Sequence, residues 1–206
     1  MFFNDHYHWY IQMQAAGFSE RLVCMSVVKM RVFAVSCATH ALQVVEANLG
    51  SRLGPFELSQ FSAPSTILDE FWRRYPSLLA PVEFAPFSHR ARSLIEDALG
   101  PEPDMLERFT VPSAEALVWS TLSAVTKEAA DDPVGKTEEA ADCAYRATFY
   151  AFADDPNEFG GDKTREIELR TPECIAELRF QLACLAAVEA SNPYPSGYEH
   201  LCRAAS

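Results

Sequence analysis

The sequence lacks several features that would assign it to a familiar class of protein. It has six cysteines but no Cys-x-x-Cys pair. Cys24, Cys143 and Cys174 lie in apolar helical patterns, which predicts reduced core thiols in a cytoplasmic protein. No window of 18 uninterrupted apolar residues occurs, so we expect no membrane span. The stretch from Met1 to His6 has no basic region before its apolar residues, so we do not expect a signal peptide.

Basic residues are scarce, and they are most outnumbered in the second half of the chain. The 206 residues include 17 Lys and Arg against 29 Asp and Glu, for a net charge of -12. Residues 1–95 carry a net charge of +1, and residues 96–206 carry -13. Such a field repels nucleic acid and anionic membranes and attracts basic surfaces. The alternative is that the acidity only keeps the protein soluble.

Standard catalytic motifs are also missing. Gly135-Lys136-Thr137 resembles the end of a phosphate-binding loop, but the required glycine is replaced by Ala130 and no strand precedes it. The sequence contains no Gly-x-Ser-x-Gly and no local Cys-His signature. His6-x-His8 lies at the N-terminus, where a surface or partner-packed role is expected in place of metal binding. We therefore expect neither a metal nor another cofactor.

Helical periodicity and helix-capping residues are present along most of the chain. They predict an all-α bundle of about six to eight helices in a single domain over residues 1–206, with a possible hinge at 100–103. The expected helices are Asn4–Ala16, Ser19 to Leu49 ending at Gly50, Ser65–Tyr75, Ser88–Leu99, one starting at Ser113, one at Asp131-Asp132-Pro133 and one at Thr171-Pro172-Glu173. Pro81 and Pro86 predict an extended connector.

The segment from Val27 to Ala38 is apolar on most sides. This pattern indicates a central buried helix. Its four valines and the alternation around Lys29 and Arg31 leave a strand as the alternative, although the flanking segments favour a helix.

Two acidic helices are expected to present polar faces to solvent. In the helix after Asp132, the positions of Glu139, Asp142 and Arg146 lie opposite the apolar stripe, and Asp142 can pair with Arg146. In the last helix, Glu173, Glu177 and Gln181 are expected to face away from the core stripe, which is formed by Ile175, Leu178, Leu182, Leu185 and Val188.

Glu139-x-x-Asp142 has the spacing of a magnesium-binding pair. Helical nucleotide pyrophosphohydrolases hold Mg²⁺ with two such pairs on neighbouring helices. The second pair would be Asp155 with Glu158, which lie in a loop, or Glu173 with Glu177, which are spaced i,i+4. The pattern is incomplete, so a solvated helix face is the simpler interpretation.

The acidic residues around the helix that follows Asp132 form the predicted binding surface for a basic protein partner. Tyr150 and Phe159 are candidate apolar anchors, with a role in the core as the alternative. The predicted partner-binding residues are Asp131, Asp132, Glu138, Glu139, Asp142, Asp154, Asp155, Glu158, Tyr150 and Phe159.

The order of the helices resembles a set of all-helical bacterial proteins that includes immunity proteins of toxin systems. The resemblance rests on Arg31–His40, on Trp72, on an Ala-rich acidic helix with Tyr145, and on a last helix that begins Thr171-Pro172-Glu173 and contains residues 177–181. It covers about residues 18–192 and implies no catalytic residue.

Three functions therefore stand as hypotheses. The first is a cytoplasmic immunity protein, not an enzyme, that neutralises a basic toxin domain such as a nuclease through its acidic surface. The second is a Mg²⁺-dependent helical nucleotide pyrophosphohydrolase. The third is an adaptor or structural protein. Neither nucleic acid nor a membrane is expected as a partner.

Overall fold

The fold is described here from a computed structural model of the protein. The structure describes residues 8–50, 52–99, 109–126, 132–154, 159 and 163–190. The predicted hinge at 100–103 lies outside them. The predicted all-α bundle is confirmed: every regular element in the described ranges is helical. In the described ranges, six helices of 13 to 23 residues build the bundle, and shorter helices lie around them.

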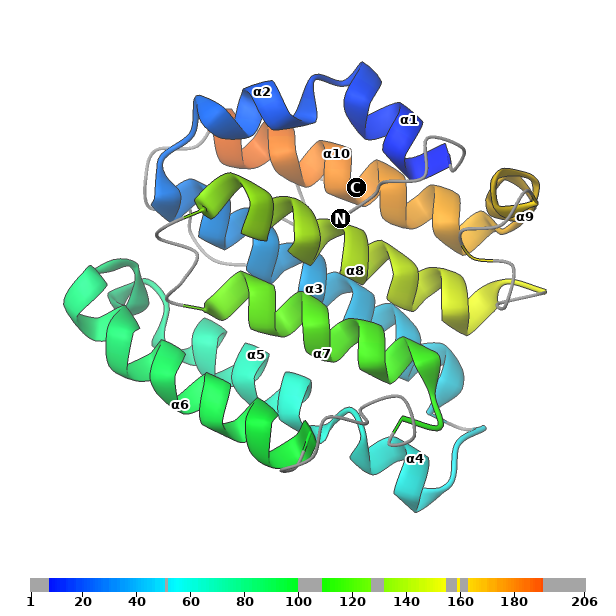
Figure 1. Ribbon diagram of the computed structural model, residues 1–206, viewed down its shortest axis with the longest axis horizontal. Coiled ribbons are helices and arrows are strands. Elements are labelled where there is room, and N and C mark those ends of the chain that lie inside the picture. The colour runs from blue at the N-terminus through cyan, green and yellow to red at the C-terminus, as the bar shows by residue number, and fades with distance from the viewer. Residues whose placement is uncertain are drawn as a thin grey trace.

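Helix α3 (Val27–Leu49) runs through the middle of the molecule, as its apolar sequence predicts (Figure 1). It packs against α7 (Pro112–Val125), α8 (Pro133–Phe152) and α10 (Pro172–Ala190). α3 has the length and mean hydropathy of a membrane-spanning helix, but 61% of its most apolar window is buried inside the bundle. Burial on nearly all sides explains why this helix shows little polar patterning.

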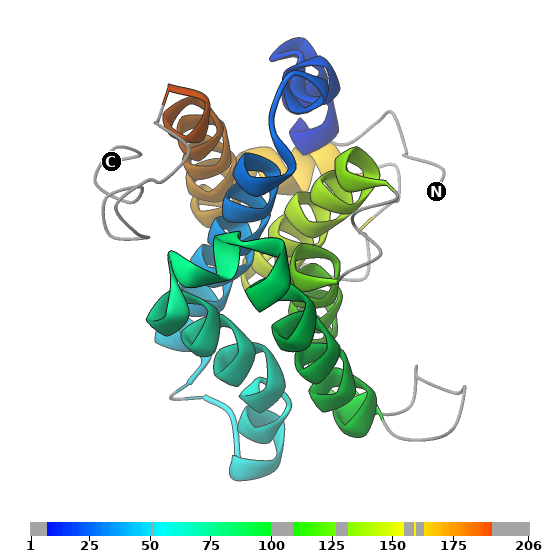
Figure 2. The same ribbon diagram turned by 90° about the vertical axis from the view of Figure 1, so that its left-hand side faces the viewer.

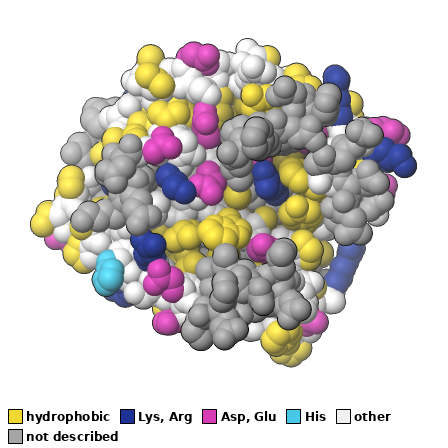
Figure 3. All heavy atoms as spheres, in the orientation of Figure 1, with side chains coloured by type: hydrophobic (Ala, Val, Ile, Leu, Met, Phe, Trp, Pro, Cys, Tyr) yellow, Lys and Arg dark blue, Asp and Glu magenta, His cyan; other side chains and the backbone are white. Residues whose placement is uncertain are grey.

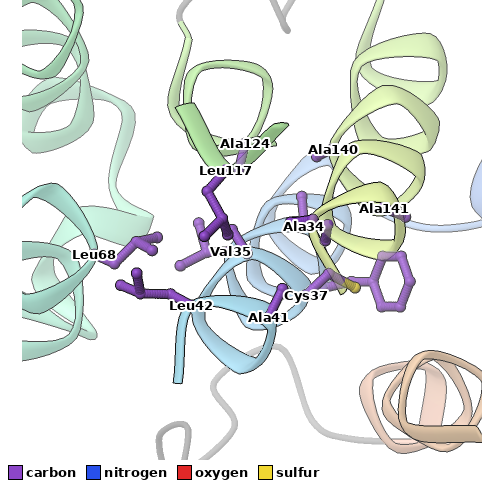
Figure 4. Close-up of a cluster of buried hydrophobic side chains, with 14 of the residues drawn as sticks. Ala34, Val35, Cys37, Ala41, Leu42, Leu68, Leu117, Ala124, Ala140 and Ala141 are labelled. Atoms are coloured by element: carbon purple, nitrogen blue, oxygen red, sulfur yellow. The ribbon is translucent and has the colours of Figure 1, made fainter. Parts of the chain in front are cut away.

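Small side chains let α3, α7 and α8 approach one another closely. Figure 4 shows Ala34 of α3 near Ala140 and Ala141 of α8, while Val35 faces Leu117 of α7. All five side chains are buried. Alanine at these contacts brings the backbones together with little loss of side-chain entropy.

The long helix predicted from Ser19 is interrupted. Helix α2 (Phe18–Val23) ends before a turn, and the hydroxyl of Ser26 accepts a hydrogen bond from the Lys29 amide at 3.4 Å to cap α3. The predicted end at Gly50 is confirmed. The turn also leaves Cys24 exposed, so its predicted place in the core is wrong.

Two groups of helices lie on opposite sides of the central helices α3, α7 and α8 (Figures 1 and 2). Helix α1 (His8–Ala15) and α2 lie on one side, where α1 contacts α9 (Thr164–Arg170) and α2 contacts α8. On the other side lie α4 (Pro55–Ser59), α5 (Ser62–Arg74), the 3₁₀ turn η1 (Ser77–Leu79) and α6 (Pro81–Leu99).

Several helix starts differ from the sequence expectation. The predicted extended connector is wrong, because α6 begins at Pro81 and holds Pro86 inside it. Proline suits the first turn of a helix, and α6 accepts the second one at the cost of a backbone hydrogen bond. Ser113 lies inside α7 and is buried, so it is not a cap. The cap at Asp132 is confirmed, with its carboxylate accepting from the Gly135 amide at 2.9 Å.

Candidate functional site

The predicted acidic residues lie in two different kinds of surroundings. Asp132 and Asp154 are exposed, just before and just after α8, while Glu138 and Glu139 are partly exposed on its first half. In Figure 3, acidic side chains with a basic one among them lie over the first half of α8 and toward α2. Three predicted residues, Asp131, Asp155 and Glu158, lie outside the described residues.

Asp142 is not part of this surface, and its predicted exposure is wrong. Its side chain is 0% exposed, and its carboxylate lies 2.6 Å from the Arg146 guanidinium. The predicted pairing with Arg146 is confirmed. The physical reason for its burial is that α8 packs against α3, α7 and α10 together, so its buried face is wider than one apolar stripe. A charge at this depth requires a partner, and Arg146 is that partner.

Tyr150 and Phe159 lie at the other end of α8 from Glu138. Both are partly buried and pack against the core. The Phe159 ring is 5.0 Å from Phe149 and 5.5 Å from Tyr150, and the Arg146 guanidinium lies 5.1 Å from its centre. At a rise of 1.5 Å per residue, Tyr150 is about 18 Å along the helix from Glu138. The two predicted anchors therefore lie apart from Glu138 and Glu139, at the end of α8 that leads to Asp154.

A cavity of about 170 Å³ opens between α1, α2 and the first half of α8. Its apolar lining comes from Trp9, Tyr10, Met13 and Phe18, and its polar lining from Gln14, Ser19, Glu20 and Glu138. The apolar members are buried except for the half-buried Tyr10, whereas the polar members are exposed or partly exposed. The cavity is thus apolar at its base and polar at its mouth.

The mouth of the cavity carries two carboxylates. Glu138 accepts a hydrogen bond from the Ser19 hydroxyl, which joins α8 to α2. Glu20 adds a second carboxylate from the first turn of α2. Within the described part of the chain, no Lys or Arg pairs with either of them. By contrast, Glu139, the next residue along α8, is 2.6 Å from the Lys136 ammonium.

The wall of the cavity is fixed by contacts with distant segments. The Trp9 indole N–H donates to the Gln181 side-chain oxygen at 2.8 Å, and the Trp9 ring lies 6.0 Å from Tyr145. Phe18 meets the same indole edge to face at 6.3 Å. Gly17, with φ +67°, makes the turn that sets α2 against α1. This conformation suits glycine because other residues pay a steric cost there.

A buried polar network lies behind that wall, and the prediction that Glu177 and Gln181 face away from the core is wrong. Their side chains are 1% and 0% exposed. The Glu177 carboxylate lies 2.6 Å from His40 Nδ1 and accepts from the Gln181 amide at 2.9 Å. The same amide donates to the Ala141 carbonyl at 3.0 Å. The network therefore joins α1, α3, α8 and α10.

Glu168 of α9 is a second buried carboxylate beneath α1. It accepts hydrogen bonds from the backbone amides of His8 and Trp9. Burial raises the pKa of Glu168, and those amide hydrogen bonds offset part of the effect. Burial also raises the pKa of the neighbouring Cys174 thiol to about 12, so this cysteine stays protonated and unreactive at neutral pH.

Three of the carboxylates that would bind magnesium pair with other side chains of the described residues, whereas Asp155 and Glu158 lie outside those residues. Glu139 pairs with Lys136, Asp142 with Arg146, and Glu177 with His40 and Gln181. Among the described residues, no group of three His, Cys, Asp or Glu side chains is arranged to hold a metal ion. The cavity volume is also below the roughly 300–1,000 Å³ of small-molecule sites.

Comparison with known proteins adds no relative. The chain matches no known protein family, no curated protein and no solved structure. Its function must therefore be argued from its own surface and interior.

The sequence analysis missed the aromatic residues of the cavity. Trp9, Tyr10 and Phe18 lie on short helices with no strong apolar stripe, and only the turn at Gly17 brings them together.

Proposed function

We propose that this chain is a cytoplasmic immunity protein that binds and neutralises a basic toxin domain, with a nuclease as the first candidate. The observation that carries the proposal is the cavity beside Glu138, which places an apolar recess within an acidic surface. Interfaces commonly combine a pocket for one buried anchor with charged residues around it.

The two parts of this surface would do different work. Exposed carboxylates at Glu20, Glu138 and Asp132 would attract a basic partner and raise its association rate by about 10–1000-fold. A side chain of the partner seated in the cavity would supply affinity and slow dissociation. Nuclease domains need basic surfaces to hold phosphates, so an acidic protein bound there would block the substrate.

The alternative of a magnesium-dependent hydrolase has less support. The glutamate and aspartate that it requires are paired with Lys136 and Arg146 inside the chain. An adaptor role uses the same surface as the immunity hypothesis, and it differs only in whether the partner loses an activity on binding.

Pull-down from the source cell followed by mass spectrometry tests the proposal. Wild type is compared with a Glu20→Lys, Glu138→Lys double variant at the cavity. The matched control is Asp69→Lys with Asp97→Lys, which makes the same change in net charge at exposed positions on α5 and α6.

We expect a basic protein that is captured by wild type and by the control but not by the cavity variant. Adding the purified wild-type chain should then inhibit the activity of the captured protein. Capture of a basic partner whose activity is unchanged would favour the adaptor. Capture that is equal for all three chains would reject this surface.

A further inference from the structure

The cavity beside Glu138 has the size of a single side chain. An enclosed space of about 150 Å³ in a protein core is enough for one benzene ring. At about 170 Å³, this cavity has room for one side chain and is smaller than the roughly 300–1,000 Å³ of small-molecule sites.

The base of the cavity favours a side chain with an apolar stem. Trp9, Tyr10 and Phe18 contribute three aromatic rings, and Met13 contributes a flexible thioether. Aromatic faces attract cations through their quadrupole, and the attraction increases when water is excluded. Methionine adapts its shape to an irregular guest.

The mouth of the cavity selects for a positive head group. A neutral apolar guest would desolvate the carboxylates of Glu20 and Glu138 without pairing them, which costs free energy. An anionic guest would add repulsion. A carboxylate has about four acceptor positions, and the Ser19 hydroxyl occupies one on Glu138, so capacity remains for a donor.

Arginine meets these requirements better than lysine. Its guanidinium is planar, stacks on aromatic rings and donates two parallel hydrogen bonds to a carboxylate. It is also less strongly hydrated than an ammonium, so it loses less when it enters a recess.

We infer that the cavity between α1, α2 and α8 binds one arginine side chain of the partner protein. The stem packs against Met13 and the aromatic residues, and the guanidinium lies between Glu20 and Glu138. The inference rests on the proposed function for the origin of the arginine, but its test needs no partner.

The probe is N-acetyl-arginine methylamide, with the norleucine analogue as the neutral control of similar length. The readout is the indole N–H resonance of Trp9 in ¹⁵N-labelled full-length chain, with the other two tryptophans as internal references. We expect a saturable shift of the Trp9 signal with a dissociation constant on the order of 1 mM, which is the range that ligand efficiency allows for a probe of this size. The norleucine analogue should bind at least about 10-fold more weakly.

Isosteric variants locate the head group. Glu138→Gln and Glu20→Gln should each weaken binding of the arginine probe by about 1.5–5-fold, the range of one exposed ion pair. Asp69→Asn on α5 should leave it unchanged. A melting temperature equal to that of wild type confirms that each variant is folded.

Any one of three results would overturn the inference. The norleucine analogue could bind as tightly as the arginine probe, or both glutamine variants could bind the arginine probe as tightly as wild type. The Trp9 signal could also show no saturable shift at probe concentrations up to about ten times the expected dissociation constant. A probe that binds while the pull-down yields no basic protein would leave the cavity assignment intact and reject the proposed function. Capture of a partner through the acidic surface without probe binding would leave the proposed function intact and reject the arginine site.

Discussion

Carboxylates inside the helical bundle and carboxylates at the cavity mouth differ in what neutralises them. Asp142 and Glu177 are buried, and each lies 2.6 Å from a basic side chain of the same molecule. Glu20 and Glu138 are exposed or partly exposed, and neither pairs with a Lys or Arg in the part of the chain that the structure describes. The buried carboxylates therefore stabilise the fold, whereas those at the cavity mouth are the ones that the proposed function assigns to a partner.

The largest effect on stability is expected at Glu177. Glu177→Ala removes one of the two acceptors of the buried Gln181 amide, which keeps the Ala141 carbonyl, and it removes the carboxylate beside His40. Loss of one partner from a buried charged network costs about 3–5 kcal/mol. Urea unfolding should show this as a lower midpoint with an unchanged slope. The isosteric Glu177→Gln should cost less, and a variant as stable as wild type would mean that the network does not hold the helices together.

Asp142→Ala should come next. It leaves the Arg146 guanidinium without its carboxylate, but Arg146 is 27% exposed and can recover part of its hydration. We expect a loss of about 2 kcal/mol, below the range for a fully buried pair. The double variant Asp142→Ala, Arg146→Met should be more stable than Asp142→Ala alone. If the loss of stability in the double variant equals the sum of the losses in Asp142→Ala and Arg146→Met, the two residues are not coupled.

Gly17 tests the turn that builds the cavity. Gly17→Ala places a side chain at φ +67° and should cost about 1 kcal/mol. Gly17→Asn should cost less, because asparagine tolerates this conformation better. Thermal unfolding measures both changes. Equal stability of the alanine variant and wild type would show that α1 and α2 can meet without this turn.

The smallest expected effect is a pH dependence of the free energy of unfolding that arises from Glu168. Its pKa is raised above 4.5 in the folded protein, so the folded chain binds more protons than the unfolded chain just above that pH. The contribution of Glu168 to the free energy of unfolding is therefore greatest at low pH and falls as pH rises from about 4.5 through the folded pKa. The stability of wild type minus that of Glu168→Gln should decline over this window. A difference that rises with pH would contradict the assigned direction.

The sequence predicted some of the features that depend only on neighbouring residues, although it misplaced the cap at Ser113 and the connector at Pro81 and Pro86. The buried middle of α3, its end at Gly50 and the cap at Asp132 follow from local periodicity and capping chemistry. The surroundings of Glu177 and Gln181 did not follow, because their partners His40 and Trp9 lie 137 and 172 positions away. Periodicity assigns a polar residue to solvent unless a distant partner is known.

The candidate site was predicted only in part. Glu138 was found because an excess of charge can be read from composition. The cavity beside it was not found, because it forms where two short helices meet at Gly17 and lie over α8. Asp142 was misplaced because helical spacing gives the direction of a side chain but not how many helices cover it.

We propose that the acidic residues at the cavity mouth act on a partner more than on the fold. The direct measurement is the association rate of the basic protein recovered by pull-down, at low and high salt, with melting temperatures measured in parallel. The Glu20→Lys, Glu138→Lys chain should associate at least about 10-fold more slowly than wild type at low salt, with a weaker salt dependence and a similar melting temperature. The Asp69→Lys, Asp97→Lys chain should associate nearly as fast as wild type. Equal slowing by both variants would mean that only net charge matters, and no slowing by either would contradict the claim.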